Sequence, residues 1–508
     1  MPLKPKTCLI NPPTTREQDE IFFPMGLVVL GTLLKEEAIP VEIVDFDLEL
    51  RKHPHLRNSP QKFEEYALKT LRACGAEVFG IGSICSNFPN ALSLAKAIRK
   101  KIPQTKIVLG GPQPSSVPQK TLECFSDIDV VVVGEGEKTL LELLQCDWNP
   151  DSLKNISGIC FHDSGKVHTT PARPLLEDLD ELPLPDFSLV DLPQYFPYEN
   201  MLALIEAGRG CPFRCSFCST AEMWSRKYRA KSPGRILEEM RILHRDYQKT
   251  HFNLTHDNFT TSPKYIRKFC DYFIEHNQKF TWSSSARTDT LKPKDLENLK
   301  KAGCKGLFFG VDSGSSRVQK AIDKHLDLEE FKEILSETVS QGIGATTSFV
   351  LGFPDETRDE IDETISLGAW AKRHGATNIQ YHRLAPLAGT KIYNDHKGRL
   401  EFNGLSSDMS VPVLVDPEIV PMMKTHPDLF SSFHTIPTPQ LKDLDMLCLT
   451  NFFTVVVNKM GPTVEWLFEE TGKKPTDLFS DWLEFTHETS NLKLFSPSFI
   501  LDSFRELL

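Results

Sequence analysis

The sequence lacks a long apolar run, and no stretch approaches the roughly 18 apolar residues that a membrane-spanning helix requires. The apolar part of its N-terminus, MPLKPKTCLINPP, is too short for a secretory signal. Basic residues are not in excess either, because 58 Lys and Arg face 69 Asp and Glu, which gives a net charge of −11. These absences predict a cytoplasmic protein with no membrane span and argue against a nucleic-acid partner.

Cysteine is also sparse, and 12 cysteines in 508 residues are too few for a disulfide framework. Three of them cluster at Cys211, Cys215 and Cys218 in RGCPFRCSFCST, while the next one, Cys270, falls within a helical pattern. A structural zinc site needs four protein ligands. Three thiolates on three irons of a 4Fe-4S cluster instead leave the fourth iron open to a substrate or cosubstrate. The alternatives are three structural thiols or a zinc site completed from elsewhere.

The length suggests about three domains, and the fold class is α/β. Residues 1–150 alternate short β-branched runs with helical patterns, which is typical of a doubly wound, Rossmann-like sheet. Strands are expected within residues 7–13, 40–47, 78–85, 105–111 and 127–137. In such a sheet the loops at the carboxyl ends of the strands hold the ligand. These loops are rich in Gly, Pro and Ser. Tight βα turns are the favoured explanation for any single loop, whereas four such loops at one sheet edge indicate a ligand platform.

The rest of the chain divides into three parts. Residues 151–200 are proline-rich and acidic, and they are interpreted as a linker. Residues 201–398 contain six strand patterns separated by helices, which predicts a partial (β/α)6 barrel with its chemistry at the C-terminal strand ends. Residues 399–508 are expected to form a mainly helical capping or substrate domain. Its aromatic residues are expected to be core rather than substrate contacts, namely Phe430, Phe433, Trp466 and Trp482.

The stretch CPFRCSFCS, at the end of the first barrel strand, closely resembles the signature of radical S-adenosylmethionine (SAM) enzymes. Further segments resemble landmarks of that family: HDNFT, WSSSARTD, AGCKGLFFGVDSGS, FVLGFPDET and LAPLAGT. In the first domain, GGPQPSS and DVVVVGEGEKTL resemble the cobalamin-binding domain that precedes the barrel in one large subclass. The resemblance covers residues 5–395 and points to the class B, methyltransferase-like radical SAM enzymes with a B12-binding domain.

This resemblance implies a set of SAM contacts. Cys211, Cys215 and Cys218 would hold a 4Fe-4S cluster whose open iron binds the amino and carboxylate groups of SAM. Phe217 would lie beside the adenine, Asp257 near the methionine ammonium, and Gly352 would let the backbone approach the adenine. Strand-end residues would hold the ribose and the carboxylate, namely Ser285, Arg287, Asp312 and Ser313. Structural alternatives stay open, since Asp257 can cap a turn and Arg287 can form a salt bridge, and Asp312 stands where relatives usually carry glutamate.

The first domain has no D-x-H-x-x-G motif, and its only histidines are His53 and His55. The resemblance therefore implies base-off cobalamin without a protein histidine ligand. Ser83, Ser86 and Asn87 would face the lower side of the corrin ring. The nucleotide tail would lie among the glycine-rich loops, at Gly110, Gly111, Pro112, Gly134, Glu135 and Gly136.

The leading interpretation is a cobalamin-dependent radical SAM methyltransferase acting on an unactivated carbon of a peptide, lipid or natural-product intermediate. A 5′-deoxyadenosyl radical would remove a hydrogen atom and methylcobalamin would supply the methyl group, with flavodoxin or ferredoxin as electron donor. Rearrangement, cyclisation or ring contraction without methyl transfer stays open. A methylthiotransferase would need a second cluster built from N-terminal cysteines, of which there are Cys8, Cys74, Cys85, Cys124 and Cys146. A cofactor-binding sensor would not require the SAM landmarks.

Overall fold

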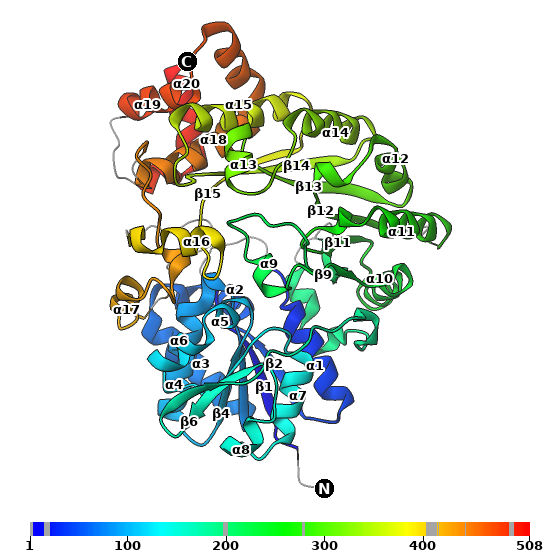
Figure 1. Ribbon diagram of the computed structural model, residues 1–508, viewed down its shortest axis with the longest axis vertical. Coiled ribbons are helices and arrows are strands. Elements are labelled where there is room, and N and C mark those ends of the chain that lie inside the picture. Colours follow the sequence, from blue (N-terminus) through cyan, green and yellow to red (C-terminus); the bar gives the residue numbers. More distant parts are fainter. Residues whose placement is uncertain are drawn as a thin grey trace.

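The computed structural model describes residues 4–14, 21–196, 202–276, 280–402, 414, 416–441, 443–486 and 492–508. Two β-sheets lie one above the other, with the short helix α9 (Thr220–Met223) between them (Figure 1). None of the helices in the described ranges is long and apolar enough to cross a membrane.

The lower sheet contains the predicted Rossmann-like strands in the order β2-β1-β3-β4-β5. They are β1 (Thr7–Asn11), β2 (Val41–Asp45), β3 (Val78–Gly82), β4 (Lys106–Gly110) and β5 (Val130–Val132), all parallel. The helices around them are α1 (Met25–Glu36), α2 (Phe46–Lys52), α3 (Pro60–Cys74), α4 (Phe88–Lys101), α5 (Pro112–Ser116), α6 (Pro118–Cys124) and α7 (Glu137–Gln145). Two separate apolar clusters bury alternate residues of the same strands, as a sheet covered on both faces requires.

A hairpin extends this sheet in the segment interpreted from the sequence as a linker. β6 (Ile159–Asp163) pairs antiparallel with β5, and β7 (Lys166–Thr169) pairs antiparallel with β6. The two-residue loop between them has positive φ at Ser164 (51°) and Gly165 (79°), as in a type I′ turn. The connecting segment therefore starts after the hairpin. The predicted boundary at residues 200 and 201 lies outside the described residues, and the domain limits stay a prediction.

The upper sheet has the predicted six parallel strands, in the order β15-β14-β13-β12-β11-β8. They are β8 (Ala203–Glu206), β11 (His251–Thr255), β12 (Thr281–Ala286), β13 (Cys304–Asp312), β14 (Gly344–Leu351) and β15 (Asn378–Arg383). Helices that alternate with them are α10 (Pro233–Tyr247), α11 (Pro263–His276), α12 (Pro293–Lys301), α14 (Leu328–Ser340) and α15 (Arg358–Arg373). The two end strands, β8 and β15, are not paired with each other, so the sheet is a partial barrel.

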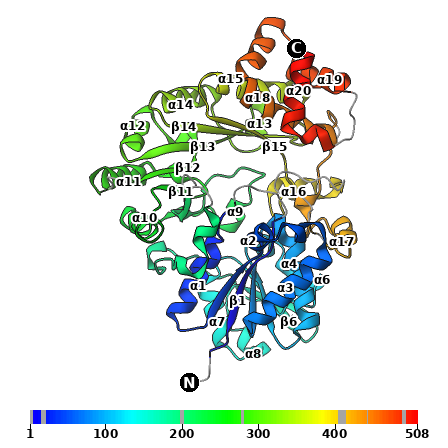
Figure 2. The same ribbon diagram turned by 180° about the vertical axis from the view of Figure 1, so that it is seen from behind.

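The C-terminal region is mainly helical, as expected, but it is shared between the two sheets. α17 (Val420–Thr425) lies beside α6 of the lower domain (Figure 2), and the ring of Phe430 packs 5.6 Å from that of Phe88. α18 (Asp443–Thr471), α19 (Pro475–Thr486) and α20 (Pro497–Leu507) lie at the barrel. Of the four aromatic residues expected to be core, Phe430, Phe433 and Trp482 are buried, whereas Trp466 is 55% exposed.

The edge strand β15 is covered by α18. The Asn458 side chain accepts from the Ile379 N–H at 2.9 Å and donates to the Ile379 carbonyl at 2.6 Å. The Thr454 hydroxyl accepts from the Tyr381 N–H at 3.1 Å. These side chains satisfy backbone groups that an open sheet edge would otherwise leave unpaired.

Candidate active site

The three clustered cysteines lie in the loop between the short strand β9 (Gly208–Arg209) and α9, and each is partly exposed. Burial raises the pKa of Cys211 to about 11 and also raises the pKa of Cys215. Cys270 is buried in α11 and is not part of this loop. Within the described ranges, no three Cys, His, Asp or Glu side chains converge on one metal-ion position. Three thiolates on three different irons need no common point, so the loop fits a cluster better than a zinc ion.

Arg287 contacts the cysteine loop directly. Its Nη1 lies 3.6 Å from the Sγ of Cys215, and its guanidinium lies 3.8 Å from the ring centroid of Phe213. Asp289 accepts two bonds from Arg287, at 2.9 and 2.6 Å, and the Lys324 carbonyl accepts a third at 3.0 Å. The predicted salt-bridge alternative is therefore present. The same positive charge lies where it stabilises the Cys215 thiolate.

Asp257 ties the two ends of the cysteine loop together. One carboxylate oxygen accepts from the Gly210 N–H at 2.6 Å, and the other accepts from the Thr220 hydroxyl at 3.1 Å. Both oxygens therefore hold the loop, which is the capping role weighed as the alternative to an ammonium contact. The predicted contact with SAM stays a prediction.

The two residues expected beside the adenine lie close together. The ring of Phe217 packs edge-on against that of Phe353, with centroids 5.6 Å apart, and Phe353 follows Gly352 in the loop after β14. The Gly352 and Phe353 N–H groups donate to one oxygen of Glu356, at 2.7 and 3.2 Å. Burial raises the pKa of Glu356 to about 8. The structure thus brings Phe217 and the Gly352 loop to one place.

Asp312 forms a buried ion pair with Lys324, a residue that sequence reasoning missed. Lys324 also donates to the Gly310 carbonyl at 2.6 Å, and its charge acts on the Cys215 thiol. No motif marks Lys324, because it lies in the turn after α13 (Ser316–Ala321). Asp312 consequently has a cationic partner within the protein.

Ser285 and Ser313 are engaged within the protein. The Ser285 hydroxyl donates to the His256 carbonyl at 2.5 Å. Ser313 has no exposed surface, and its hydroxyl accepts from the Ser315 N–H at 3.1 Å. Ser313 therefore shapes the loop after β13, and a SAM contact through its side chain would need that loop to rearrange.

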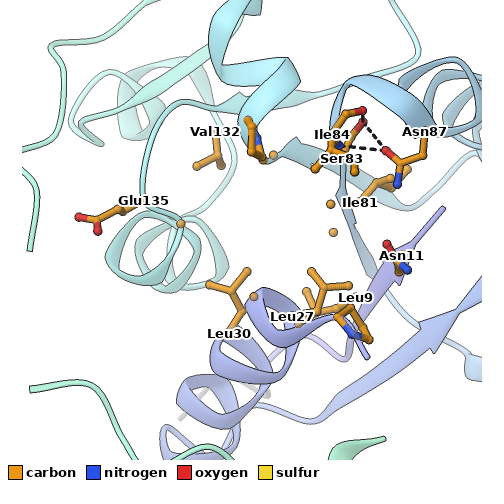
Figure 3. A pocket seen from close by; sticks show the side chains of 18 of the residues that line it. Leu9, Asn11, Leu27, Leu30, Ile81, Ser83, Ile84, Asn87, Val132 and Glu135 are labelled. Carbon is orange, nitrogen blue, oxygen red and sulfur yellow. Dashed lines mark hydrogen bonds between the residues drawn. The ribbon is translucent and has the colours of Figure 1, made fainter. Parts of the chain in front are cut away.

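A cavity of about 660 Å³ opens at the carboxyl edge of the lower sheet. All nine residues predicted to surround cobalamin line it: Ser83, Ser86, Asn87, Gly110, Gly111, Pro112, Gly134, Glu135 and Gly136. Leu9, Leu27 and Leu30 form an apolar wall opposite Ser83 and Asn87 (Figure 3). Its volume lies within the range of cofactor pockets, and no histidine occurs among the described residues that line it.

Close backbone contacts shape this cavity. Gly111 has φ +106°, and a Cβ there would lie 2.4 Å from the Ser83 carbonyl oxygen, so the loops after β3 and β4 touch. The Asn87 side-chain oxygen accepts from the Ile84 N–H at 2.9 Å and from the Ser83 hydroxyl at 3.1 Å (Figure 3). Two of the predicted polar contacts thus hold each other in place.

Glu135 differs from its predicted role. It lines the cavity, but its carboxylate points away from the centre (Figure 3). One oxygen accepts from Arg209 at 2.7 Å and Arg229 at 2.8 Å, and the other accepts from the Leu176 N–H at 2.7 Å. Both carboxylate oxygens of Glu135 are therefore used in contacts that join the two domains, and not in a contact with the nucleotide tail of a cofactor.

Sequence reasoning missed other residues of the same cavity. Arg209, Met223 and Trp224 line it from the cysteine-loop side, so the cavity reaches from the lower sheet to α9. Asn11, Thr14 and Asp47 line it from the first two strand ends. The rule that ligands lie at carboxyl strand ends could have found this second set. For the first set, the only signal in the sequence was the position of Arg209 beside the cysteine motif.

A second cavity of about 560 Å³ lies on the concave face of the upper sheet. Its lining is rich in hydroxyl and amide side chains, including Asn253, Thr255, Ser283, Ser285 and Thr346. Phe308, which is 39% exposed, supplies an aromatic surface. The barrel interior therefore offers hydrogen-bonding groups next to a strand end that carries a predicted SAM contact.

Two family models match the chain. The radical SAM superfamily model matches residues 205–368, and the B12 binding domain model matches residues 15–144. The first range contains the three cysteines and the second contains all nine predicted cobalamin residues.

Several curated relatives are similar over most of the chain. An uncharacterised methyltransferase from Pyrococcus horikoshii is 29% identical over 392 residues, which cover 76% of this chain and 82% of the relative. Cytidylyl-2-hydroxyethylphosphonate methyltransferase from Streptomyces wedmorensis is 24% identical, with 77% and 81% covered. Anaerobic magnesium-protoporphyrin IX monomethyl ester cyclase from Cereibacter sphaeroides is 25% identical, with 70% and 58% covered.

Solved structures share the whole fold. The radical SAM methyltransferase TsrM from Kitasatospora setae, with cobalamin and an iron–sulfur cluster bound, matches with a TM-score of 0.69 and 16% identity over 99% of this chain and 100% of TsrM. The cobalamin-dependent radical enzyme OxsB matches with a TM-score of 0.67 and 17% identity over 99% of this chain and 78% of OxsB. With both family models matched in order along one chain, this protein combines a radical SAM domain with an N-terminal B12-binding domain.

Proposed function

We propose that this enzyme, whose family uses SAM on a 4Fe-4S cluster together with cobalamin, methylates an unactivated carbon. The observation that carries the proposal is the continuity of the 660 Å³ cavity, which is lined by the predicted cobalamin loops and by Met223 and Trp224, just after the cysteine loop. This continuity supports a shared interface for the proposed sites of the two cofactors. When bound, they supply hydrogen-atom abstraction at the cluster side and a methyl group at the cobalamin side.

The chain's own residues then have distinct tasks. Cys211, Cys215 and Cys218 would hold the cluster, while Arg287 places its positive charge 3.6 Å from the Cys215 sulfur. Asp257 keeps the loop closed through its bonds to Gly210 and Thr220. On the cobalamin side, the apolar wall of Leu9, Leu27 and Leu30 would limit the access of water, which protects reactive intermediates from side reactions.

On the cobalamin side, the glycine-rich loops would accept the corrin ring and its tail, with Ser83 and Asn87 beneath it. Because no histidine lies among the described lining residues, we propose that cobalamin binds base-off and without a histidine ligand. The EPR spectrum of the reduced cobalt tests this directly. Superhyperfine splitting from an axial nitrogen would contradict it.

The substrate would reach the barrel interior. The hydroxyl- and amide-rich lining of the second cavity favours a substrate with hydrogen-bonding groups over a plain hydrocarbon lipid. Phe308 would pack against an apolar part of such a molecule. A small molecule or a peptide side chain with polar groups fits this description, and a flavodoxin or ferredoxin would supply the electron.

A second candidate function is cyclisation or rearrangement without methyl transfer. It is favoured by the 25% identity to a curated cyclase. A methylthiotransferase is disfavoured, since two of the five N-terminal cysteines that would have to build its second cluster, Cys8 and Cys74, are buried. A non-enzymatic sensor leaves the Phe217 and Gly352 arrangement unexplained.

Anaerobic reconstitution and SAM turnover separate these functions. The purified protein, supplied with iron, sulfide and hydroxocobalamin, should show cobalamin bands beside iron–sulfur absorption. Turnover with a reductant and substrate should yield 5′-deoxyadenosine and S-adenosylhomocysteine together. Deoxyadenosine alone would favour rearrangement, and failure to bind cobalamin would refute the two-cofactor proposal.

A further inference from the structure

Five buried or partly buried charged residues join the two domains beside the cysteine loop. Arg209 donates to Glu135 at 2.7 Å, to Glu137 at 2.7 Å and to Glu206 at 2.8 Å. Arg229 donates to the same oxygen of Glu135 at 2.8 Å. We call these five residues the Arg209 cluster. It has three carboxylates and two guanidiniums, and Glu135, Glu137, Arg209 and Arg229 each have side chains less than 9% exposed.

One side of the Arg209 cluster belongs to the cobalamin cavity. Glu135 lies in the loop between β5 and α7, Glu137 is the first residue of α7, and both line the cavity together with Gly134 and Gly136. Because Arg209 donates to the carboxylates of Glu135 and Glu137, a shift of this loop on ligand binding would move the Arg209 guanidinium or break these hydrogen bonds. Arg209 also lines the cavity itself.

The other side of the cluster leads to the first cysteine. Arg209 is followed by Gly210 and Cys211. Gly210 has φ +90°, and a Cβ there would lie 1.9 Å from the Lys227 carbonyl oxygen, so its backbone has no free space. Its N–H is held by Asp257 at 2.6 Å. A displacement of Arg209 is therefore passed to the cysteine loop instead of being absorbed at Gly210.

Trp224 makes a second connection. Its ring lies 5.8 Å from the Arg209 guanidinium and 5.5 Å from that of Arg229, and it also lines the cavity. Trp224 follows α9, which begins two residues after Cys218. Both ends of the cysteine loop thus contact the Arg209 cluster, one through the chain and the other through a cation–π contact.

The electrostatics make this arrangement selective for one geometry. Burial alone would raise the pKa of Glu206, but the Arg209 charge, the hydrogen bond from Arg209 and the Lys231 charge together outweigh it, and the pKa is lowered. Ions removed from water are stable only when they are paired with good geometry, because an unpaired buried charge is strongly unfavourable. Small displacements of the loop therefore have a large energetic effect, which is what transmission between two sites requires.

We propose that the Arg209 cluster couples the two cofactor sites. Cobalamin in its cavity tightens the cysteine loop around the iron–sulfur cluster, and the bound iron–sulfur cluster in turn tightens cobalamin binding. This inference rests on the proposed assignment of both cofactors. Thermodynamic linkage requires the coupling to be equal in both directions. Arg209 is a positioning residue in this scheme, since it acts through Glu135 and the cysteine loop.

The test measures hydroxocobalamin affinity with and without the reconstituted cluster, in the full-length protein. We expect the cluster to lower the cobalamin Kd about tenfold, a typical size for such coupling. We also expect cobalamin to change the EPR spectrum of the reduced cluster. In Arg209→Lys, which keeps one charge but loses the bidentate fork, both effects should disappear while each cofactor still binds alone. Glu135→Gln is the second variant if Arg209→Lys folds poorly.

Arg173→Lys is the matched control. Arg173 bonds Glu142 and Thr139 on α7, on the same domain, but it does not belong to the Arg209 cluster. The Arg173→Lys variant should keep the wild-type tenfold ratio between the cobalamin Kd values without and with the iron–sulfur cluster. The proposal is overturned if Arg209→Lys and Glu135→Gln also keep the wild-type ratio of cobalamin Kd values. That result is expected if the Arg209 cluster only joins the two domains. The proposal is equally overturned if wild-type protein binds both cofactors without coupling, whereas failure to bind either cofactor refutes the proposed function itself.

Discussion

Replacing Arg287 by alanine should separate the structural role of this residue from its electrostatic effect on the iron–sulfur cluster. The side chain is 7% exposed, and it is paired with Asp289 through bonds of 2.9 and 2.6 Å. Breaking a buried ion pair costs about 3–5 kcal/mol, and the 23% exposure of Asp289 argues for the lower end. Loss of the contact with Phe213 adds about 0.5–1 kcal/mol. We expect the unfolding free energy to fall by about 3–4 kcal/mol.

The assay is denaturant unfolding of the cluster-free protein, compared with the Arg245→Ala variant. Arg245 has the same bidentate geometry, with bonds of 2.6 and 2.8 Å to Asp246, but its side chain is 71% exposed. We expect no measurable change there, because water already solvates both charges. Equal losses in both variants, or no loss in either, would refute the argument from burial.

The same variant has a redox consequence. Removing a positive charge 3.6 Å from the Cys215 sulfur makes addition of an electron to the cluster less favourable, so the reduction potential should become more negative. Arg287→Lys keeps the charge and should shift the potential less, although it loses the bidentate bonds. A potential identical in wild type and Arg287→Ala would mean that the guanidinium does not act on the cluster.

Three further predictions follow from burial. Cys215→Ala should lose the iron–sulfur absorption after reconstitution, whereas Cys270→Ala, whose cysteine is buried in α11, should keep it; iron content checks both. Trp482→Ala should lower the unfolding free energy by about 3–5 kcal/mol, because Trp482 is fully buried and its Nε1 donates to Ser503 at 2.9 Å. The control Trp466→Ala, at a site that is 55% exposed, should change the unfolding free energy by less than about 0.5 kcal/mol. Burial raises the pKa of Glu356 from 4.5 to about 8, so the folded state holds a proton that the unfolded state releases, and stability should fall as pH rises through that window. Melting temperatures of Glu356→Gln should decline less than those of wild type between about pH 6 and pH 8, and parallel curves would contradict the assignment.

Much of the fold could be predicted from the sequence because buried parallel strands leave a strong pattern. Continuous apolar runs such as residues 78–81 and 107–109 are covered on both faces, and each ends in a glycine-containing loop at the same sheet edge. The strand-end rule pointed to these loops, the resemblance to B12-binding domains pointed to nine residues within them, and all nine line one cavity. The hairpin of β6 and β7 was not predicted, because its only signal is a single Ser-Gly turn within a proline-rich, acidic stretch.

The individual roles at the site could not be predicted in the same way. Glu135 and Arg209 are 74 positions apart, and their ion pair exists only because two domains meet there. Ser313 is buried because the loop after β13 packs against Thr364 of α15, which no local pattern records. Spacing therefore identified which loops gather at the site, whereas the partner of each polar side chain depended on the tertiary fold.

The packing of the C-terminal region on the first domain has a consequence for biosynthesis. The Gln113 side chain donates to the Leu429 carbonyl at 2.9 Å across 316 residues of chain, and Leu429, Phe430 and Phe433 belong to the apolar core of the N-terminal domain. During translation the first domain emerges early but lacks this part of its core until residue 433 has left the ribosome. Its apolar surface stays uncovered for that interval, when aggregation competes with folding. We therefore expect chains that end before residue 429 to require chaperones or to be degraded.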